Sequence, residues 1–102
     1  MKVIFKKSDT GILAFYPEIA ANYGKIFAFE YLGKAPMGQG CLGGHMEIPL
    51  DYYLSLKSAK PNEYAEALEN LRHIYDESLE VRQRINYNDL RYKAWKKIDI
   101  VK

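Results

Sequence analysis

Residues 61–76 read PNEYAEALENLRHIYD, and this stretch decides the fold because its pattern fits one kind of element. Pro61 suits the first position of a helix, since its fixed φ fits there and its missing N–H would have no partner. Apolar residues then recur at steps of three and four, namely Tyr64, Ala67, Leu68, Leu71, Ile74 and Tyr75. The spacing predicts an amphipathic helix whose apolar stripe must be covered by another layer of the fold.

The first third of the chain supplies the predicted covering layer. Residues 2–7 and 12–16 are apolar segments separated by turn-forming residues, which predicts a hairpin with Gly11 in the left-handed position of its turn. The segment 12–16, ILAFY, is apolar on both faces and is therefore expected inside the sheet. Residues 25–32 alternate and predict a third strand with an aromatic face. Short links between the strands favour an antiparallel meander.

The second half of the chain has a less regular pattern. Residues 33–44, GKAPMGQGCLGG, hold five of the seven glycines and are expected to be irregular. Residues 48–57 fit a strand or a short helix begun by Pro49, and the spacing of their apolar residues favours the helix. Residues 79–85, LEVRQRI, alternate and predict a half-exposed fourth strand. Residues 86–98 predict a basic terminal helix that asparagines cap.

The composition is typical of one small globular domain. The chain has 102 residues, of which 48% are hydrophobic and 27% charged, and its formal net charge is +2. This length has room for a single core, so we predict one α+β domain over residues 1–102. The predicted architecture is an antiparallel three- to four-stranded sheet packed by the central amphipathic helix, with a basic C-terminal helix.

The sequence also bears on the compartment. No apolar run reaches the roughly 20 residues that span a bilayer, and residues 1–11 lack the apolar core of a signal peptide. The single Cys41 excludes an internal disulfide. We therefore expect a cytoplasmic protein that does not bind a membrane.

Several motifs together carry a resemblance to known proteins. The hairpin that begins KVIFKK, a glycine-bearing loop ending in His45, the run DYYLSLKSAKPNEYAEALENL and the segment LEVRQRI resemble a group of small proteins carried by phages and mobile elements of bacteria. In that group the loop reads roughly Val-Gly-Gln-His before an Asp-Tyr pair, and a Thr-Pro-Glu-Glu-Tyr helix start follows.

This chain departs from the group at two places. Gly38 and Gln39 are separated from His45 by the insertion GCLGG, and Lys60 and Asn62 replace the threonine and the glutamate. The resemblance spans residues 2–85 and brings no activity with it. It implies a small accessory protein that blocks or redirects a host component.

Three patterns bear on catalysis and metal binding. Cys41 and His45 lie four apart, and a thiol with an imidazole is the minimum for a nucleophile and its base, but the spacing offers no third group to orient them. A small buried thiol and a hydrogen-bonded histidine are favoured instead. The glycine-rich segment lacks both established phosphate fingerprints, and its Lys34 precedes the glycines. Glu69 and His73 have a spacing more typical of a surface contact. We expect no enzyme, no metal and no cofactor.

Binding to a protein partner is the function favoured by exclusion. The chain has nine tyrosines, which supply large and stiff contact area, and a glycine-rich loop that can adapt to a surface. We predict a non-enzymatic binding protein that occupies a surface of a host protein, and self-association stays open. The predicted contact residues are Met37, Gln39, Leu42, His45, Tyr52, Tyr53 and Trp95.

Two alternatives also stay open. Nucleic acid could be held through phosphate contacts while an aromatic ring stacks on a base, although the near-neutral net charge is unfavourable. The basic residues for that role are Arg82, Arg84, Arg91, Lys93, Lys96 and Lys97. The second alternative is a small ligand such as a nucleotide, held by the glycine-rich loop against the aromatic strand face.

Overall fold

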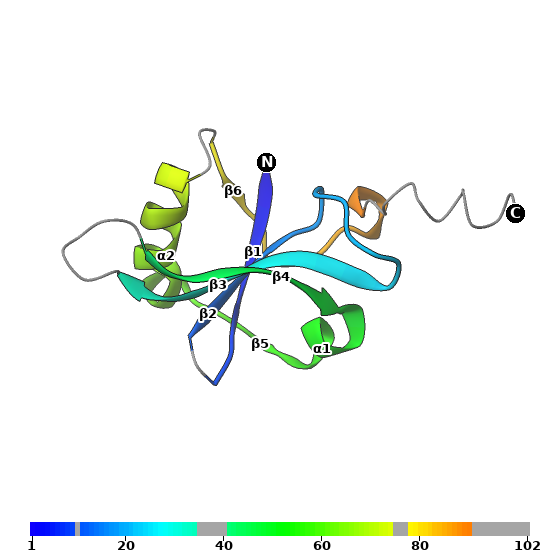
Figure 1. Cartoon of the computed structure of the whole chain (residues 1–102), viewed down its shortest axis with the longest axis horizontal. Coiled ribbons are helices and arrows are strands. Elements are labelled where there is room, and N and C mark those ends of the chain that lie inside the picture. The colour runs from blue at the N-terminus through cyan, green and yellow to red at the C-terminus, as the bar shows by residue number, and fades with distance from the viewer. Residues whose placement is uncertain (10, 35–40, 75–77, 91–102) are drawn as a thin grey trace, which may run out of the picture.

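Four antiparallel strands in chain order form a meander at the centre of the fold (Figure 1). The computed structural model describes residues 1–9, 11–34, 41–74 and 78–90. The strands of the meander are β1 (Lys2–Lys7), β2 (Ile12–Tyr16), β3 (Lys25–Lys34) and β4 (Cys41–Pro49). Two short strands both pair with β1 on its other side: β5 (Lys57–Ser58), which is antiparallel, and β6 (Glu80–Val81), which is parallel. The architecture is α+β, and its sheet is larger than the three to four strands predicted.

The central helix forms where its apolar stripe predicts it. This helix, α2, runs over Pro61–Ile74. Ala67 and Leu71 on its inner face are fully buried, and the ring of Tyr64 stacks on that of Phe5 with 4.5 Å between centroids. The stripe is therefore covered by the sheet, as the pattern requires.

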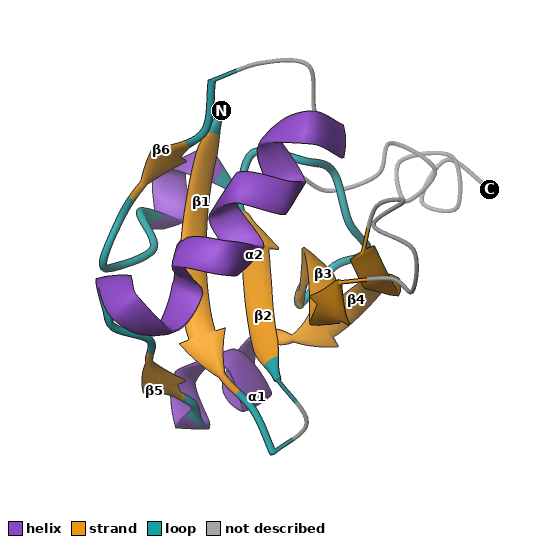
Figure 2. Cartoon of the chain, turned by 90° about the vertical axis from the view of Figure 1, so that its left-hand side faces the viewer, coloured by secondary structure: helices purple, strands orange, loops and turns teal. Residues whose placement is uncertain are grey.

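The middle of the sheet is buried on both faces, which explains why β2 is apolar throughout. The core on the α2 side contains Val3, Phe5, Ala14, Tyr16, Phe29, Tyr31, Ala59, Ala67, Leu71 and Leu79. The core on the other side contains Ile4, Leu13, Phe15, Ile26, Ala28, Ile48 and Tyr53, and the short helix α1 (Leu50–Ser55) closes it. Figure 2 shows α2 crossing the sheet while α1 lies behind it. The predictions of an internal β2 and of a helix within residues 48–57 are confirmed.

The first hairpin is confirmed, but its glycine acts differently from the prediction. Gly11 is not among the glycines with positive φ. A Cβ at this position would instead collide with the backbone oxygen of Tyr31 on β3. The turn is closed by Ser8, whose N–H donates to the Gly11 oxygen at 2.9 Å. The position thus needs a small residue because two strands approach closely.

The prediction of an irregular segment over residues 33–44 is wrong at both of its ends. β3 continues to Lys34 and β4 begins at Cys41, and the two strands pair with each other. Residues 35–40 lie outside the described part. Hydrogen bonding to β3 outweighs the weak strand preference of glycine, because that preference depends strongly on context.

The fourth predicted strand is shorter than expected. Of residues 79–85, only Glu80 and Val81 pair, and they lie parallel to β1. Leu79 then belongs to the α2-side core, whereas Ile85 packs against the core on the α1 side. The two residues do not share one face, because the chain leaves the sheet after β6.

The basic terminal helix is not formed in the residues that are described. A single 3₁₀ turn, Tyr87–Asp89, stands where that helix should begin, and Leu90 after it is extended with ψ 136°. The side chain of Asn86 caps this turn by accepting the N–H of Asn88, so the predicted capping role of the asparagines applies to a shorter element. Residues 91–102 lie outside the described part.

Candidate functional site

The predicted protein-binding residues fall in different parts of the fold. Met37, Gln39 and Trp95 lie outside the described residues. Leu42 and His45 lie in β4, and the backbone of Leu42 is opposite that of Gly33. Tyr52 and Tyr53 follow one another in α1 but have opposite surroundings, since Tyr52 is 48% exposed and Tyr53 only 2%.

Tyr53 is therefore a core residue and its prediction as a surface contact is wrong. Its ring meets that of Phe15 edge-on at 4.8 Å, inside the core closed by α1. Burial raises the pKa of the Tyr53 hydroxyl, and a backbone hydrogen bond from Ile85 partly offsets this rise. The sequence could not separate the two tyrosines, because both fit a short helix and only tertiary packing decides which one turns inward.

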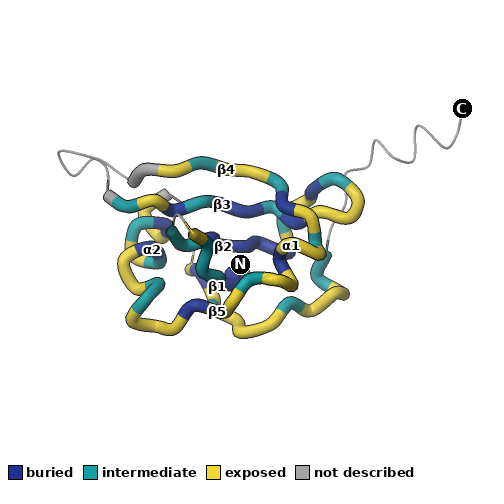
Figure 3. Tube along the Cα trace, turned by 90° about the horizontal axis from the view of Figure 1, so that it is seen from below, coloured by how far each residue is buried: buried dark blue, intermediate teal, exposed yellow. Residues whose placement is uncertain are grey.

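β4 forms one border of the sheet. It pairs with β3, and no described strand pairs with its other side (Figure 3). Leu50, directly after β4, donates its N–H to the Gly24 oxygen at 2.9 Å. Hydrogen-bonded and non-hydrogen-bonded residue pairs alternate along an antiparallel ladder. Since Leu50 is hydrogen-bonded to the β3 side, the even-numbered residues from 44 to 48 also turn their backbone N–H and C=O groups toward β3. The odd-numbered residues turn theirs outward: Gly43, His45, Glu47 and Pro49.

His45 packs on aromatic rings rather than on a catalytic partner. Its ring lies 4.9 Å from that of Phe29 and 5.3 Å from that of Phe27, on the α2 side of the sheet. Cys41 and His45 lie four positions apart in the same extended strand, so their backbones are about 13 Å apart. This separation argues against the nucleophile and base weighed from the sequence.

Beside β4, on the α1 side of the sheet, lies a hollow of about 560 Å³ with mostly apolar walls. Its walls are Ser8, Asp9, Leu13, Glu30, Met46, Ile48, Pro49 and Tyr52. Met46 and Tyr52 are 36% and 48% exposed, and nearby on β3 Leu32 is 46% exposed. We call Met46, Tyr52 and Leu32 the apolar border. Tyr52 is the predicted contact residue that belongs to it, whereas Met46 and Leu32 were missed because single apolar residues in a strand predict burial.

A second hollow, of about 680 Å³, has a different chemistry. Its walls come from β1, α1, β5 and the segment after β6: Lys6, Tyr53, Leu54, Ser58, Gln83, Arg84, Ile85 and Tyr87. We call it the basic hollow. Of these residues the sequence singled out only Arg84 and, for another role, Tyr53. Lys6 and Gln83 carry no signal of their own, since only the crossing of distant segments brings them together.

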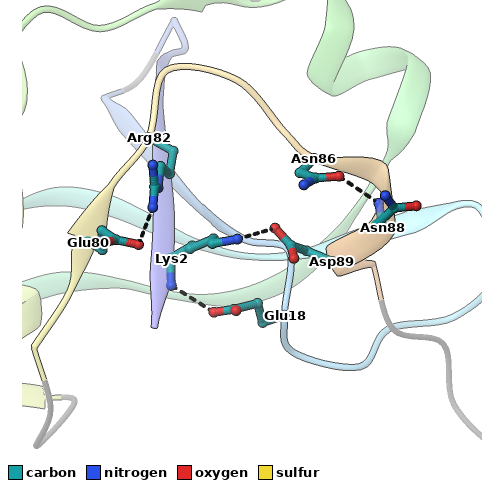
Figure 4. Close-up of polar contacts among 7 residues, drawn as sticks. All are labelled: Lys2, Glu18, Glu80, Arg82, Asn86, Asn88 and Asp89. Carbon is teal, nitrogen blue, oxygen red and sulfur yellow. Dashed lines mark hydrogen bonds and ion pairs between the residues drawn. The ribbon is translucent and has the colours of Figure 1, made fainter.

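A smaller hollow of about 220 Å³ adjoins it, and Arg84 lines both. Polar contacts in and around the smaller one are drawn in Figure 4. Lys2 Nζ lies 2.8 Å from a carboxylate oxygen of Asp89, and Arg82 lies 2.6 Å from one of Glu80. Arg82 and Arg84 are the described members of the predicted nucleic-acid set. The others, Arg91, Lys93, Lys96 and Lys97, lie outside the described residues.

No site for a metal ion is found within the described ranges. They contain no group of three histidine, cysteine, aspartate or glutamate side chains close enough to hold one. Glu69 and His73 do line a common shallow hollow along α2, together with Tyr64 and Arg72. Neither described helix has the length and apolar character needed to cross a bilayer.

Comparisons with known proteins complete the description of the site. A scan against protein-family models and searches of the curated proteins and of the solved structures found no match. Two features of the described residues have the geometry of a binding site: the outer side of β4 and the basic hollow.

Proposed function

We propose that this chain is a non-enzymatic binding protein that attaches to a host protein by taking up one of its strands along the outer side of β4. The observation that carries the proposal is the outward direction of the backbone groups of Gly43, His45 and Glu47. An added strand gains affinity from such main-chain bonds and specificity from pockets for alternate side chains. In line with the resemblance, the bound host component would be blocked or redirected.

The sequence of β4 supports this use of its edge. Exposed edge strands are usually protected by lysines, prolines or bulges, because bare ones pair with other chains. The segment CLGGHMEIP has no lysine or arginine, and its proline stands at the last position. Its one carboxylate, Glu47, accepts the backbone N–H of Asn22 at 3.1 Å, which engages it with a neighbouring loop of the same chain. Gly43, His45 and Met46, in the middle of the strand, are exposed.

The apolar border indicates the chemistry of the partner strand. Side chains alternate between faces along a strand, so every second residue of an added strand would lie on the α1 side, near Met46 and Tyr52. We expect apolar residues there. On the α2 side the added strand would meet His45 and Glu47, where polar residues fit. The partner segment is therefore an extended one with alternating apolar and polar side chains.

The backbone contact can be tested with proline. Replacing His45 by proline removes an outward N–H, which edge positions tolerate, and leaves the ladder with β3 intact. We expect His45→Pro to remain folded and to lose at least tenfold in affinity for the host protein. His45→Ala keeps the N–H and is the matched control, because it removes the same ring. Its affinity should stay within about threefold of the wild type.

The readout is capture of a stoichiometric protein from host lysate, followed by hydrogen exchange on the purified complex. Exchange is followed at the amides of His45 and Glu47, which point away from β3, and at those of Met46 and Ile48, which point toward it. Partner binding should slow hydrogen exchange at the amides of His45 and Glu47, and not at those of Met46 and Ile48. Equal capture by His45→Pro and the wild type, no capture at all, or protection confined to another surface would contradict the proposal.

A further inference from the structure

The basic hollow is lined by positive charge that its own walls do not neutralise. None of its eight wall residues is an aspartate or a glutamate. Within the described ranges Lys2, Lys7 and Arg82 each form an ion pair, whereas no carboxylate lies at ion-pair distance from Lys6 or Arg84. Two cations from distant segments thus border one hollow, with no counter-charge among its eight walls.

The position of Lys6 makes its charge favourable for an incoming anion. Its Nζ donates to Ser58 Oγ at 3.3 Å and stands over the ring of Tyr53, 4.9 Å from the centroid. A hydroxyl and an aromatic ring stabilise an ammonium less than a carboxylate does. Burial also lowers the pKa of Lys6. An anion in the hollow would restore the interaction that the ammonium loses on leaving water. Arg84 on the facing segment can bind the oxygens of a phosphate in a fork.

The remaining walls offer a surface for a flat ring. Tyr87 is 54% exposed and Leu54 58%, while Ile85 is partly buried between the hollow and the core. Tyr87 is held in place because its 3₁₀ turn is capped by Asn86, and because Asp89 of the same turn is bound to Lys2 at 2.8 Å. A fixed and exposed tyrosine is a stacking platform for a nucleobase.

We infer that the basic hollow binds a phosphorylated nucleoside, with its phosphate between Lys6 and Arg84 and its base against Tyr87. The polar groups of Gln83 and Ser58 remain available for hydrogen bonds to the base or the sugar. The volume of about 680 Å³ lies within the range of small-ligand sites. The ligand can be a free nucleotide or one unit of a single-stranded nucleic acid, because both present a base next to a phosphate.

Calorimetric titration of the full chain with nucleoside 5′-monophosphates tests this inference. The matched nucleosides and inorganic phosphate are titrated in parallel. We expect at least one monophosphate to bind at least tenfold more tightly than its nucleoside and than phosphate, and more weakly at high salt. No heat from any monophosphate up to millimolar concentration would overturn the inference. So would phosphate alone binding as tightly as the nucleotides, which is the behaviour of a plain anion site.

Variants locate the binding. Arg84→Gln and Tyr87→Ala change exposed side chains, so both should fold, and each should weaken nucleotide binding at least tenfold. Arg72→Gln is the matched control, because it removes the same charge from an exposed arginine of α2 that does not line the basic hollow. Its binding should stay within about threefold of the wild type. A loss as large as that of Arg84→Gln would mean that general positive charge binds the ligand, and would overturn the assignment.

A short single-stranded oligonucleotide separates the two sources of the ligand. Tighter binding than the monophosphate, with the same dependence on Arg84 and Tyr87, identifies a nucleic-acid strand. Binding of the monophosphate alone identifies a free nucleotide. Both outcomes support the hollow as the site. The outcome is independent of the proposal for β4, because His45→Pro should not change the titration.

Discussion

At the scale of single residues, Glu63 performs two tasks with one carboxylate. Its Oε1 accepts the backbone N–H of Lys60 at 2.7 Å, which supplies the capping contact that the lysine before α2 cannot give. Its Oε2 accepts a hydrogen bond from the ammonium of Lys7 at 2.9 Å, which connects the helix to β1. Both contacts favour the ionised carboxylate, so they lower the pKa of Glu63, the Lys60 bond most of all.

This pKa shift predicts how stability depends on pH. A lowered pKa in the folded state means that Glu63 stabilises the fold above the ordinary glutamate value of 4.5, and that this contribution is lost as the pH falls through the folded-state value. Glu63→Gln should therefore melt below the wild type at pH 7, and this difference in melting temperature should be smaller at about pH 3. Thermal unfolding followed by circular dichroism at both values measures it.

The control is Glu69→Gln, which changes an exposed glutamate of the same helix. Its melting temperature should follow that of the wild type at both pH values. If the difference in melting temperature between Glu63→Gln and the wild type stays constant, or widens in acid, the carboxylate contributes by packing rather than by its charge.

At the scale of elements, two neighbouring glycines of β4 have different requirements. Gly43 has φ +132°, and a Cβ there would collide with the backbone oxygen of Glu30. Gly44 has ordinary φ and open space around it. We predict that Gly43→Ala lowers the free energy of unfolding by about 1–3 kcal/mol through strain, whereas Gly44→Ala changes it by less than about 0.5 kcal/mol.

Denaturant unfolding of the two variants measures this difference. Hydrogen exchange should place the weakening of Gly43→Ala at the paired ends of β3 and β4. Equal stabilities of the two variants would show that β3 and β4 separate freely at this end, and would count against a fixed edge for a partner strand.

How far the elements could be predicted from the sequence depended on where their stabilising contacts come from. The pattern of α2 is local, because residues such as Ala67 and Leu71 recur on one helical face, and the prediction holds. The strand character of residues 41–44 comes from pairing with β3, which no local pattern records. The same is true of β5, whose two residues pair only because β1 lies beside them.

At the scale of the whole molecule, β1 holds the fold together. It pairs with β2 and also with β5 and β6, from two distant parts of the chain. The backbone bond from Glu80 N–H to the Met1 oxygen, 2.8 Å, and that from Arg82 N–H to the Val3 oxygen, 2.9 Å, fix the last segment to the first strand. Leu79 in that segment is 3% exposed and belongs to the α2-side core.

We predict from this that residues 78–82 unfold together with the sheet. Leu79→Ala should lower the free energy of unfolding by about 2–5 kcal/mol, as expected for a buried leucine, and the transition should stay single. Near- and far-ultraviolet circular dichroism should give the same midpoint in urea. Leu54→Ala, at a position 58% exposed, is the control and should change little. Two separate midpoints would show that the β6 segment opens on its own.

The candidate site was less predictable than the fold for the same reason. Arg84 and Tyr52 are visible as candidates because charge and aromatic character can be read directly from the sequence. Lys6, Tyr53 and Gln83 line the same hollow only because β1, α1 and the segment after β6 pack together. This packing brings together residues up to about eighty positions apart, and periodicity within a window of about fifteen residues contains no information on such distant contacts.

The central place of β1 has a consequence for synthesis on the ribosome. The four strands of the meander can pair while the chain is still growing, but β1 stays open on one side until β5 and β6 have emerged. The nascent chain therefore passes through a stage in which both the outer side of β4 and one side of β1 lack a paired strand. The side of β1 is covered later by β5 and β6. Unpaired borders are where new chains aggregate, so this protein is most vulnerable between the emergence of β4 and that of β6.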